Sequence, residues 1–124
     1  MRAIIDSDVL IDYLQGLRWA KLELERYSKR EISIISWMEI LAGAASPDDE
    51  ANCTDFLNSF TIHPLSVEIA AEAVNIRRSF RIRLPDAIAW ATARCEGCLL
   101  VTRNTKDFPP TEPSIRIPYK IRVI

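Results

Sequence analysis

Short apolar runs alternate with longer segments of helical character along the whole chain, and this alternation constrains the fold more than any other feature. The apolar runs predict strands at 2–6, 32–35, 60–65, 98–102 and 114–118. The segments between them predict helices at 7–16, 17–30, 36–44, 47–59, 66–80 and 84–97. Continuous apolar strands joined through helices indicate a parallel sheet that is covered on both faces. We therefore expect one α/β domain over residues 1–124, with a mostly parallel central sheet of about five strands and helices on both faces.

Composition argues against several classes of protein. No apolar run approaches the roughly 18–20 residues that a membrane-spanning helix needs, and acids interrupt the first dozen positions, unlike in a signal peptide. Three cysteines, an odd number, fit reduced thiols, so we expect a cytoplasmic protein with no membrane contact. Residues 1–62 carry 6 basic and 11 acidic side chains, whereas residues 63–124 carry 10 and 6. A basic half can face phosphates, although chance variation of the surface explains the asymmetry equally well.

Carboxylates occur where the predicted strands end. Asp6 ends the first strand, Glu39 lies one helical turn after the second, and Asp86 sits in the first turn of the last predicted helix. Asp107 comes just after the fourth strand. Because parallel strands end at one edge of a sheet, we expect these acids to converge there. Crowded carboxylates favour a hard divalent cation, Mg²⁺ or Mn²⁺, which can polarise a phosphodiester and supply a hydroxide for in-line attack.

Each acid also has a purely structural interpretation. Glu39 can be the reciprocal half of a capping box with Ser36. Asp86 can complement a helix dipole, Asp107 can be a turn residue, and Asp8 can cap the first helix. The acid that ends the first strand is the hardest to explain in this way, because a buried strand carries it directly. The coincidence of four acids at strand exits favours a functional site.

The motifs that contain these acids resemble, in order and spacing, those of the PIN-domain ribonucleases. The matching stretches are "IIDSDVLIDYL", "SIISWMEILAGA" and "LPDAIAWATARCEGCLLVTRNTKDF", which span nearly the whole chain. The resemblance is closest to the VapC toxins of bacterial and archaeal toxin–antitoxin pairs. It implies a PIN fold and a metal-dependent endoribonuclease, the toxin of a type II toxin–antitoxin system. It also implies a homodimer, an RNA substrate and a cognate VapB-like antitoxin.

The resemblance assigns roles to the acids residue by residue. It implies that Asp6, Glu39 and Asp86 are the core acids, with Asp107 as the fourth and Asn104 as an accompanying polar residue. Asp6 and Asp86 would be the main ligands of Mg²⁺ (or Mn²⁺). Glu39 and Asp107 would complete the shell through water or position the attacking water. Relatives differ over which residue after the fourth strand supplies the last acid, and Asn104 cannot ligate as a carboxylate.

The first motif departs from the family pattern. The usual Thr-Asn after the first acid is Ser7-Asp8 here, so the hydroxyl is kept and a charge is added. We expect Asp8 to be a helix cap with a possible outer contact to the ion. Asp12, one helical turn further along, is expected to be an exposed surface acid.

Polar and basic side chains beside the acids are candidates for binding RNA. Arg103 and Lys106 are expected to contact phosphates, together with Ser7 and Asn104, with plain surface solubility as the alternative for the two cations. A basic run at a helix end offers either an RNA track or a patch for a partner's acidic tail, unless it only complements the helix dipole. The run consists of Arg77, Arg78, Arg81 and Arg83.

Other residues with chemical potential are expected to be structural. Cys95 and Cys98 have Cys-x-x-Cys spacing, but the chain offers no second ligand pair for zinc. His63 has no nearby nucleophile. The tryptophans fall on predicted helices and are expected in the core or at a subunit interface; they are Trp19, Trp37 and Trp90.

Two other classes of function remain open. The first motif fits a haloacid-dehalogenase-type phosphatase, with Asp6 as nucleophile and Asp8 as acid, but the chain lacks that family's Gly-Asp and is short for it. A non-catalytic binding module with a degenerate PIN fold is expected to lose a core acid, and none is lost. Metal-dependent RNA cleavage distinguishes the nuclease from both, whereas phosphate release from small esters identifies the phosphatase.

Overall fold

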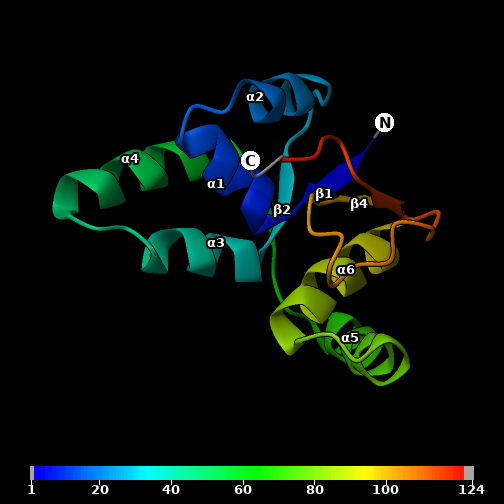
Figure 1. The fold of residues 1–124 in the computed structure, drawn as a ribbon. Helices are drawn as coiled ribbons and strands as arrows, with labels where there is room; N and C mark the ends of the chain where they lie inside the picture. The colour runs from blue at the N-terminus through cyan, green and yellow to red at the C-terminus, as the bar shows by residue number, and fades with distance from the viewer. Residues whose placement is uncertain (1, 122–124) are drawn as a thin grey trace.

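The computed structural model describes residues 2–121, and its centre is a five-stranded sheet whose neighbouring strands are all parallel. The strand order is β3-β2-β1-β4-β5. The strands are short: β1 (Ala3–Ile5), β2 (Glu31–Ser33), β3 (Thr61–His63), β4 (Leu99–Val101) and β5 (Ile115–Arg116). The predicted α/β fold with a parallel sheet of about five strands is therefore confirmed (Figure 1).

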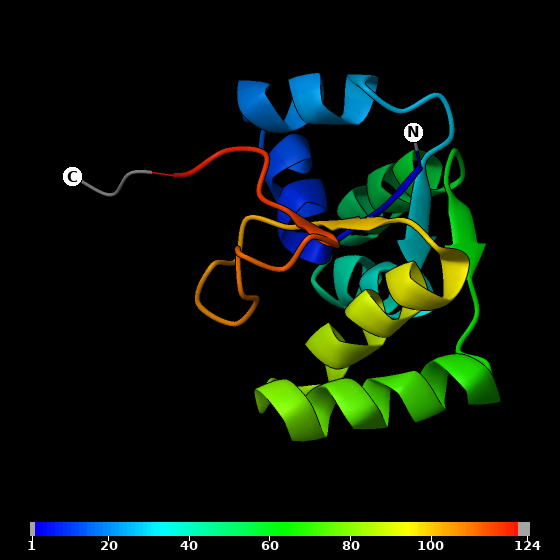
Figure 2. The same cartoon turned by 90° about the vertical axis from the view of Figure 1, so that its right-hand side faces the viewer.

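Helices cover both faces of this sheet. Within the described residues they are α1 (Ser7–Leu14), α2 (Arg18–Glu25), α3 (Ile34–Ala42), α4 (Pro47–Leu57), α5 (Val67–Phe80) and α6 (Leu84–Glu96). Helices α5 and α6 lie together on one face, and the first four helices lie on the other (Figures 1 and 2). The second predicted helix, at 17–30, is shorter than expected, and α5 and α6 are close to the predicted ranges.

The central strand β1 separates two hydrophobic cores. Successive residues of a strand point to opposite faces, so Ala3 and Ile5 pack with the first four helices, whereas Ile4 packs against α5 and α6. Trp90, fully buried, anchors the second core, and its ring meets that of Phe108 edge-on at 6.0 Å between centroids. Because helices cover both faces of β1, the residue that directly follows this strand lies between the two helical layers.

Helix α3 begins earlier than the sequence suggests. Ser33 ends β2 in an extended conformation and caps α3, its hydroxyl accepting a hydrogen bond from the N–H of Ile35 at 3.2 Å. Ser36 is consequently buried inside the helix, so the predicted capping box of Ser36 and Glu39 is wrong. The side chain of Glu39 is therefore available for other contacts.

The described cysteines and tryptophans differ in burial. All three cysteines are free thiols, Cys53 being buried, Cys98 half-buried and Cys95 exposed. Trp90 lies in the core as expected, whereas Trp19 on α2 is 56% exposed. Among the helices formed by residues 2–121, none is long and apolar enough to cross a membrane.

A buried ionic cluster lies where β1 and β2 begin. Glu31 is fully buried and receives a bidentate pair from Arg2, with Nη2 at 2.6 Å and Nε at 3.0 Å. His63 Nε2 lies 2.9 Å from the same carboxylate, so His63 has a structural partner. The guanidinium of Arg2 lowers the pKa of Glu31 to about 2, against the opposing effect of burial. The sequence does not reveal this cluster, because a single glutamate before an apolar run resembles a loop residue.

We expect Glu31→Gln to lower the free energy of unfolding by about 1–3 kcal/mol at pH 7, because Arg2 and His63 lose the charged acceptor that they share and Arg2 keeps only the partly exposed Glu96. Urea denaturation measures the loss. Because the pKa of Glu31 is lower in the folded than in the unfolded chain, the stabilisation is complete above about pH 4.5 and is lost as the pH falls toward 2. The variant and wild type should therefore have the same free energy of unfolding in acid. Glu96→Gln, at a partly exposed acid of the same cluster, should cost less than about 1 kcal/mol. Equal stability of Glu31→Gln and wild type at pH 7 would contradict the prediction.

Candidate active site

The carboxyl ends of β1 and β4 open onto a cleft of about 190 Å³ with a strongly acidic lining. Its walls come from the start of α1, from α3, from the start of α6 and from the segment after β4. The lining residues are Asp6, Ser7, Asp8, Ile11, Glu39, Arg83, Asp86 and Asn104. Three of the four acids predicted for the site, from segments far apart in sequence, thus meet in one space. We call this space the acid cleft.

Asp6 is the most constrained of these acids. It caps α1, with Oδ1 accepting from the N–H of Ser7 at 2.9 Å, and its side chain is buried. Oδ2 accepts from the hydroxyl of Thr102 at 2.9 Å. Thr102 is itself fully buried directly after β4, so one hydrogen bond joins the ends of two neighbouring strands.

Asp8 has a different role from the predicted one. The residue that caps α1 is Asp6, and Asp8 lies within the first turn of the helix and lines the acid cleft. Its Oδ2 is 3.2 Å from the hydroxyl of Thr102. That hydroxyl has one hydrogen and can donate to only one of the two aspartates at a time. The other oxygen of Asp8, Oδ1, is buried, and no described residue offers it a hydrogen-bond partner.

Glu39 reaches the cleft from α3. Its Oε1 accepts a hydrogen bond from the hydroxyl of Ser7 at 2.7 Å, and Ser36 lies 3.2 Å from the same hydroxyl. The serine that replaces the family's threonine after Asp6 therefore holds a carboxylate in place. The contact ties the start of α1 to the middle of α3.

The start of α6 and the loop after β4 supply the remaining predicted acids. Asp86 lines the cleft and meets Arg83, whose Nε and Nη2 both lie 3.4 Å from its Oδ2. Asp107 lies outside the cleft lining, but Asn104 donates to its Oδ2 at 2.8 Å and does line the cleft. The backbone N–H groups of Lys106 and Asp107 donate to Oδ1 of Asn104, so the amide fixes this turn. Lys106 itself is exposed and does not line the cleft.

Burial and mutual repulsion disfavour the charged forms of these acids. Burial, and then the charge of Asp8, raises the pKa of Asp6 to about 8, with a smaller effect from Asp86. Burial also raises the pKa of Asp8 and of Asp86, and the charges of Asp107 and Glu39 add to the effect on Asp86, while Arg83 opposes it. The lining therefore carries more negative than positive charge, with Arg83 as its one cation among the described lining residues.

The donor set fits a hard divalent cation. It consists of oxygens, and one of them, Asp8 Oδ1, is buried without a hydrogen-bond donor among the described residues. Carboxylate oxygens are the ligands that Mg²⁺ and Mn²⁺ prefer. A bound cation would relieve the repulsion that raises these pKa values.

Arg103 and Asp12 form an ion pair beside the cleft, so the predicted exposure of Asp12 is wrong. Asp12 is buried, not exposed, and its Oδ1 accepts from Arg103 Nη2 at 3.1 Å. The hydroxyl of Tyr119 donates to Asp12 Oδ2 at 2.7 Å. Arg103 thus pairs with a buried carboxylate and does not line the cleft, and its predicted contact with phosphate stays a prediction.

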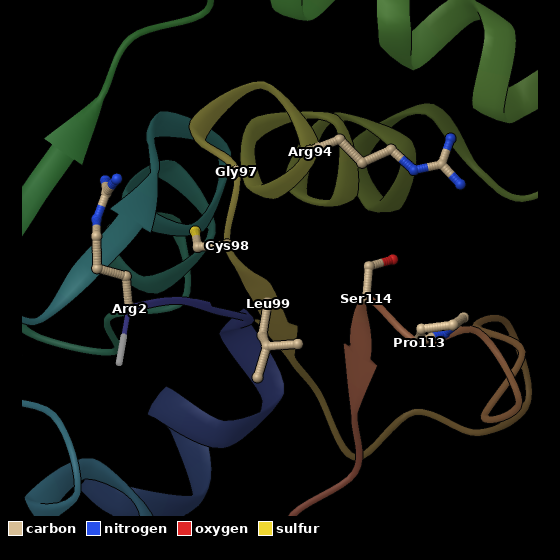
Figure 3. Close-up of a pocket in the computed structure, with 7 residues that line it drawn as sticks. All are labelled: Arg2, Arg94, Gly97, Cys98, Leu99, Pro113 and Ser114. Atoms are coloured by element: carbon tan, nitrogen blue, oxygen red, sulfur yellow. The ribbon is translucent and has the colours of Figure 1, made fainter.

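Two further places in the described part of the structure could be considered as functional sites because of their polar groups. A hollow of about 750 Å³ lies at the opposite end of the sheet and has no carboxylate in its lining. Figure 3 shows its two arginines, Arg2 and Arg94, pointing away from each other, and both are already paired with glutamates. Ligand atoms of Glu31, His63 and Glu96 lie within 4.8 Å of one another, but Arg2 already supplies the cation there. The acid cleft is therefore the candidate site.

Comparison with known families agrees with this geometry. The PIN-domain family model matches residues 3–110. The chain belongs to the PIN-domain family. A toxin–antitoxin complex from Klebsiella pneumoniae contains a chain 40% identical to this PIN domain, and the match covers 97% of this chain and 100% of the other, with a TM-score of 0.90. The resemblance to VapC-type toxins is thereby confirmed.

More distant structures share the fold. VapBC2 from Rickettsia felis, solved with a promoter DNA fragment, is 20% identical with a TM-score of 0.77, covering 93% of this chain and 96% of that one. DNA-bound VapBC from Salmonella typhimurium is 20% identical with a TM-score of 0.79, covering 94% and 96%. No curated protein matches the chain. PIN-domain toxins are nucleases, so the acid cleft of this PIN domain is a candidate nuclease site.

Thr102 is the site residue that the sequence analysis missed. It touches both Asp6 and Asp8, and it accepts a hydrogen bond from the N–H of Asn104 at 3.1 Å. Its position as the first residue after an apolar strand, and as the first polar residue of the motif that ends in Asp107, is the signal that identifies it.

We expect Asp6→Asn to stabilise the metal-free PIN domain. Folded Asp6 retains a proton that the unfolded chain releases above about pH 4, so its contribution to stability falls as the pH rises from about 4 to about 8. An asparagine keeps the acceptor for Ser7 and removes this penalty. In EDTA at pH 7.5 the gain should be about 1–3 kcal/mol, seen as a higher melting temperature, and it should vanish near pH 4. Equal melting temperatures of wild type and Asp6→Asn at pH 7.5 would refute this prediction.

Proposed function

We propose that this PIN domain is a metal-dependent endoribonuclease and the toxin of a type II toxin–antitoxin pair. The acid cleft carries the proposal, because Asp6, Asp8, Glu39 and Asp86 line one space whose charge calls for a cation. The 40% identity to a chain of a toxin–antitoxin complex supports the assignment as a toxin. RNA is the substrate that the resemblance to VapC toxins implies.

The proposed ligands follow from the positions of the acids. We assign Asp6 and Asp86, which both line the cleft, as direct ligands of Mg²⁺ or Mn²⁺. Glu39 and Asp107 act through water, which agrees with the position of Asp107 outside the lining. A bound ion of this kind lowers the pKa of a water molecule and stabilises negative charge on the phosphate.

Neutral side chains orient the carboxylates. Ser7 donates to Oε1 of Glu39, which leaves Oε2 for a water molecule in the cleft, and we assign Glu39 Oε2 as the proton acceptor. Thr102 fixes Asp6 in the same way. Asn104 fixes Asp107 and, as a lining residue, offers an amide to the substrate. These contacts set the geometry before substrate arrives, which is the main source of catalytic power in such sites.

We propose a VapB-like antitoxin as the partner, acting in the cytoplasm. A groove of about 370 Å³ runs between α1, α3 and α4 with apolar residues such as Leu14 and Ile40 in its lining. Ile11 and Glu39 line both this groove and the acid cleft, so a peptide seated in the groove would reach the acids. A homodimer remains part of the proposal, and light scattering of the purified chain tests it.

We expect Asp86→Asn and Asp6→Ala each to lower the rate of RNA cleavage by at least about 100-fold, because each removes a proposed ligand. Cleavage of a mixed RNA ladder with Mg²⁺ or Mn²⁺ measures it, and EDTA should abolish it. Asp55→Asn, which removes the same charge from an exposed position on α4, is the matched control and should retain full activity.

Two outcomes would overturn the nuclease proposal. One is the absence of metal-dependent cleavage by wild type. The other is cleavage that persists in both variants of the proposed ligands. Release of inorganic phosphate from small esters would instead point to the phosphatase.

A further inference from the structure

The acid cleft needs a positive side chain for its substrate. A phosphodiester is an anion, and the lining carries four carboxylates, those of Asp6, Asp8, Glu39 and Asp86. Even with a divalent cation bound, the lining acids outnumber its charge when they are ionised. A nucleic-acid backbone therefore approaches this space only with help from a cation of the protein. Among the described residues that line the cleft, the one cation is Arg83.

The other basic residues considered for phosphate binding are already paired or lie outside the cleft lining. Arg103 is paired with buried Asp12, and Lys106 does not line the cleft. Arg77, in the last turn of α5, donates through Nη1 to the backbone carbonyl of Ile82 at 2.6 Å. This bond braces the turn that leads to Arg83.

The contact of Arg83 with Asp86 is weak enough to be exchanged. The side chain of Arg83 is 74% exposed, and both of its contacts converge on one oxygen, Asp86 Oδ2, at 3.4 Å. Good charge-assisted hydrogen bonds are several tenths of an ångström shorter, and exposed ion pairs contribute little. The backbone of Arg83, by contrast, is the N-cap position of α6, so the base of the side chain is fixed beside the acids.

We infer, on the basis of the proposed nuclease function, that Arg83 binds the substrate phosphate, and that it competes with the divalent cation for Asp86 when RNA is absent. The same guanidinium then has two partners. It neutralises Asp86 in the metal-free cleft, and it turns to the phosphate when the carboxylate is occupied by the cation. The basic run that contains Arg83 was already one predicted RNA track, and this proposal narrows it to one residue; the phosphate contacts predicted for Arg103 and Lys106 stay predictions.

The first test measures metal binding without RNA. Calorimetric titration of Mn²⁺ into Arg83→Ala should give a dissociation constant about two- to fivefold lower than in wild type, because an exposed competitor for Asp86 is gone. Arg83→Lys should lie near wild type. Arg18→Ala removes the same charge from an exposed residue of α2 outside the cleft lining, and its affinity should stay within about twofold of wild type. Equal Mn²⁺ affinity in Arg83→Ala and wild type would overturn the competition.

The second test measures cleavage at saturating Mn²⁺. Arg83→Ala should lower kcat/KM for RNA by about 10- to 100-fold, the usual worth of a charge-assisted contact, although its metal site is full. Arg83→Lys should recover part of this loss, and Arg18→Ala should not reproduce it. Tighter metal binding together with slower cleavage is a combination that a merely structural role does not give. Cleavage by Arg83→Ala at the wild-type rate would overturn the phosphate contact. Failure of wild type to cleave RNA would overturn the nuclease proposal, and the Mn²⁺ titration would still decide the competition at Asp86.

Discussion

The buried carboxylate of Asp6 is the constraint on which the functional end of this PIN domain depends. It follows the central strand, where both faces of the sheet are covered, and the described residues that donate to it are Ser7 and Thr102. Burying an unpaired charge costs several kcal/mol. Binding of a cation removes that cost, whereas without a cation the fold favours the protonated acid. If the proposed cation binds here, stability of the metal-free fold and metal affinity are opposed through this one side chain.

The buried acids at the two ends of the sheet have pKa values that are shifted in opposite directions. Glu31, where β2 begins, meets the guanidinium of Arg2, and its pKa falls to about 2. Asp6, where β1 ends, meets Asp8 instead, and its pKa rises to about 8. Burial disfavours the charged form of both acids. At Glu31 the guanidinium overcomes this effect, whereas at Asp6 burial is the largest cause of the rise and the charge of Asp8 adds to it. The acid at one end is paired with a cation of the protein, and the acid at the other end belongs to the site for which a divalent cation is proposed.

The sequence predicted the parts of this site that depend on local pattern. Alternating strands and helices indicate the parallel sheet, and a parallel sheet brings strand ends to one edge, which is why Asp6, Glu39 and Asp86 share a cleft. The errors concern partners that are distant in the chain. Asp12 was expected in solvent, yet it is buried and pairs with Arg103, 91 positions away in the chain. Helical spacing predicts which face of a helix carries a side chain, but it does not predict which residues of other segments contact that side chain.

The sequence by itself determined the fold class, the edge of the sheet that carries the acids and the chemistry that carboxylate oxygens favour. Those properties follow from the periodicity of apolar residues, the length of the connections and the residue types, all of which can be read from neighbouring positions in the chain. The tertiary structure alone decided which arginines pair with buried carboxylates and which one lines the acid cleft. Arg2 and Arg103 are bound to buried carboxylates, whereas Arg83 stands exposed at the rim of the cleft. Charge pairing depends on distance in space, and only the folded chain fixes that distance.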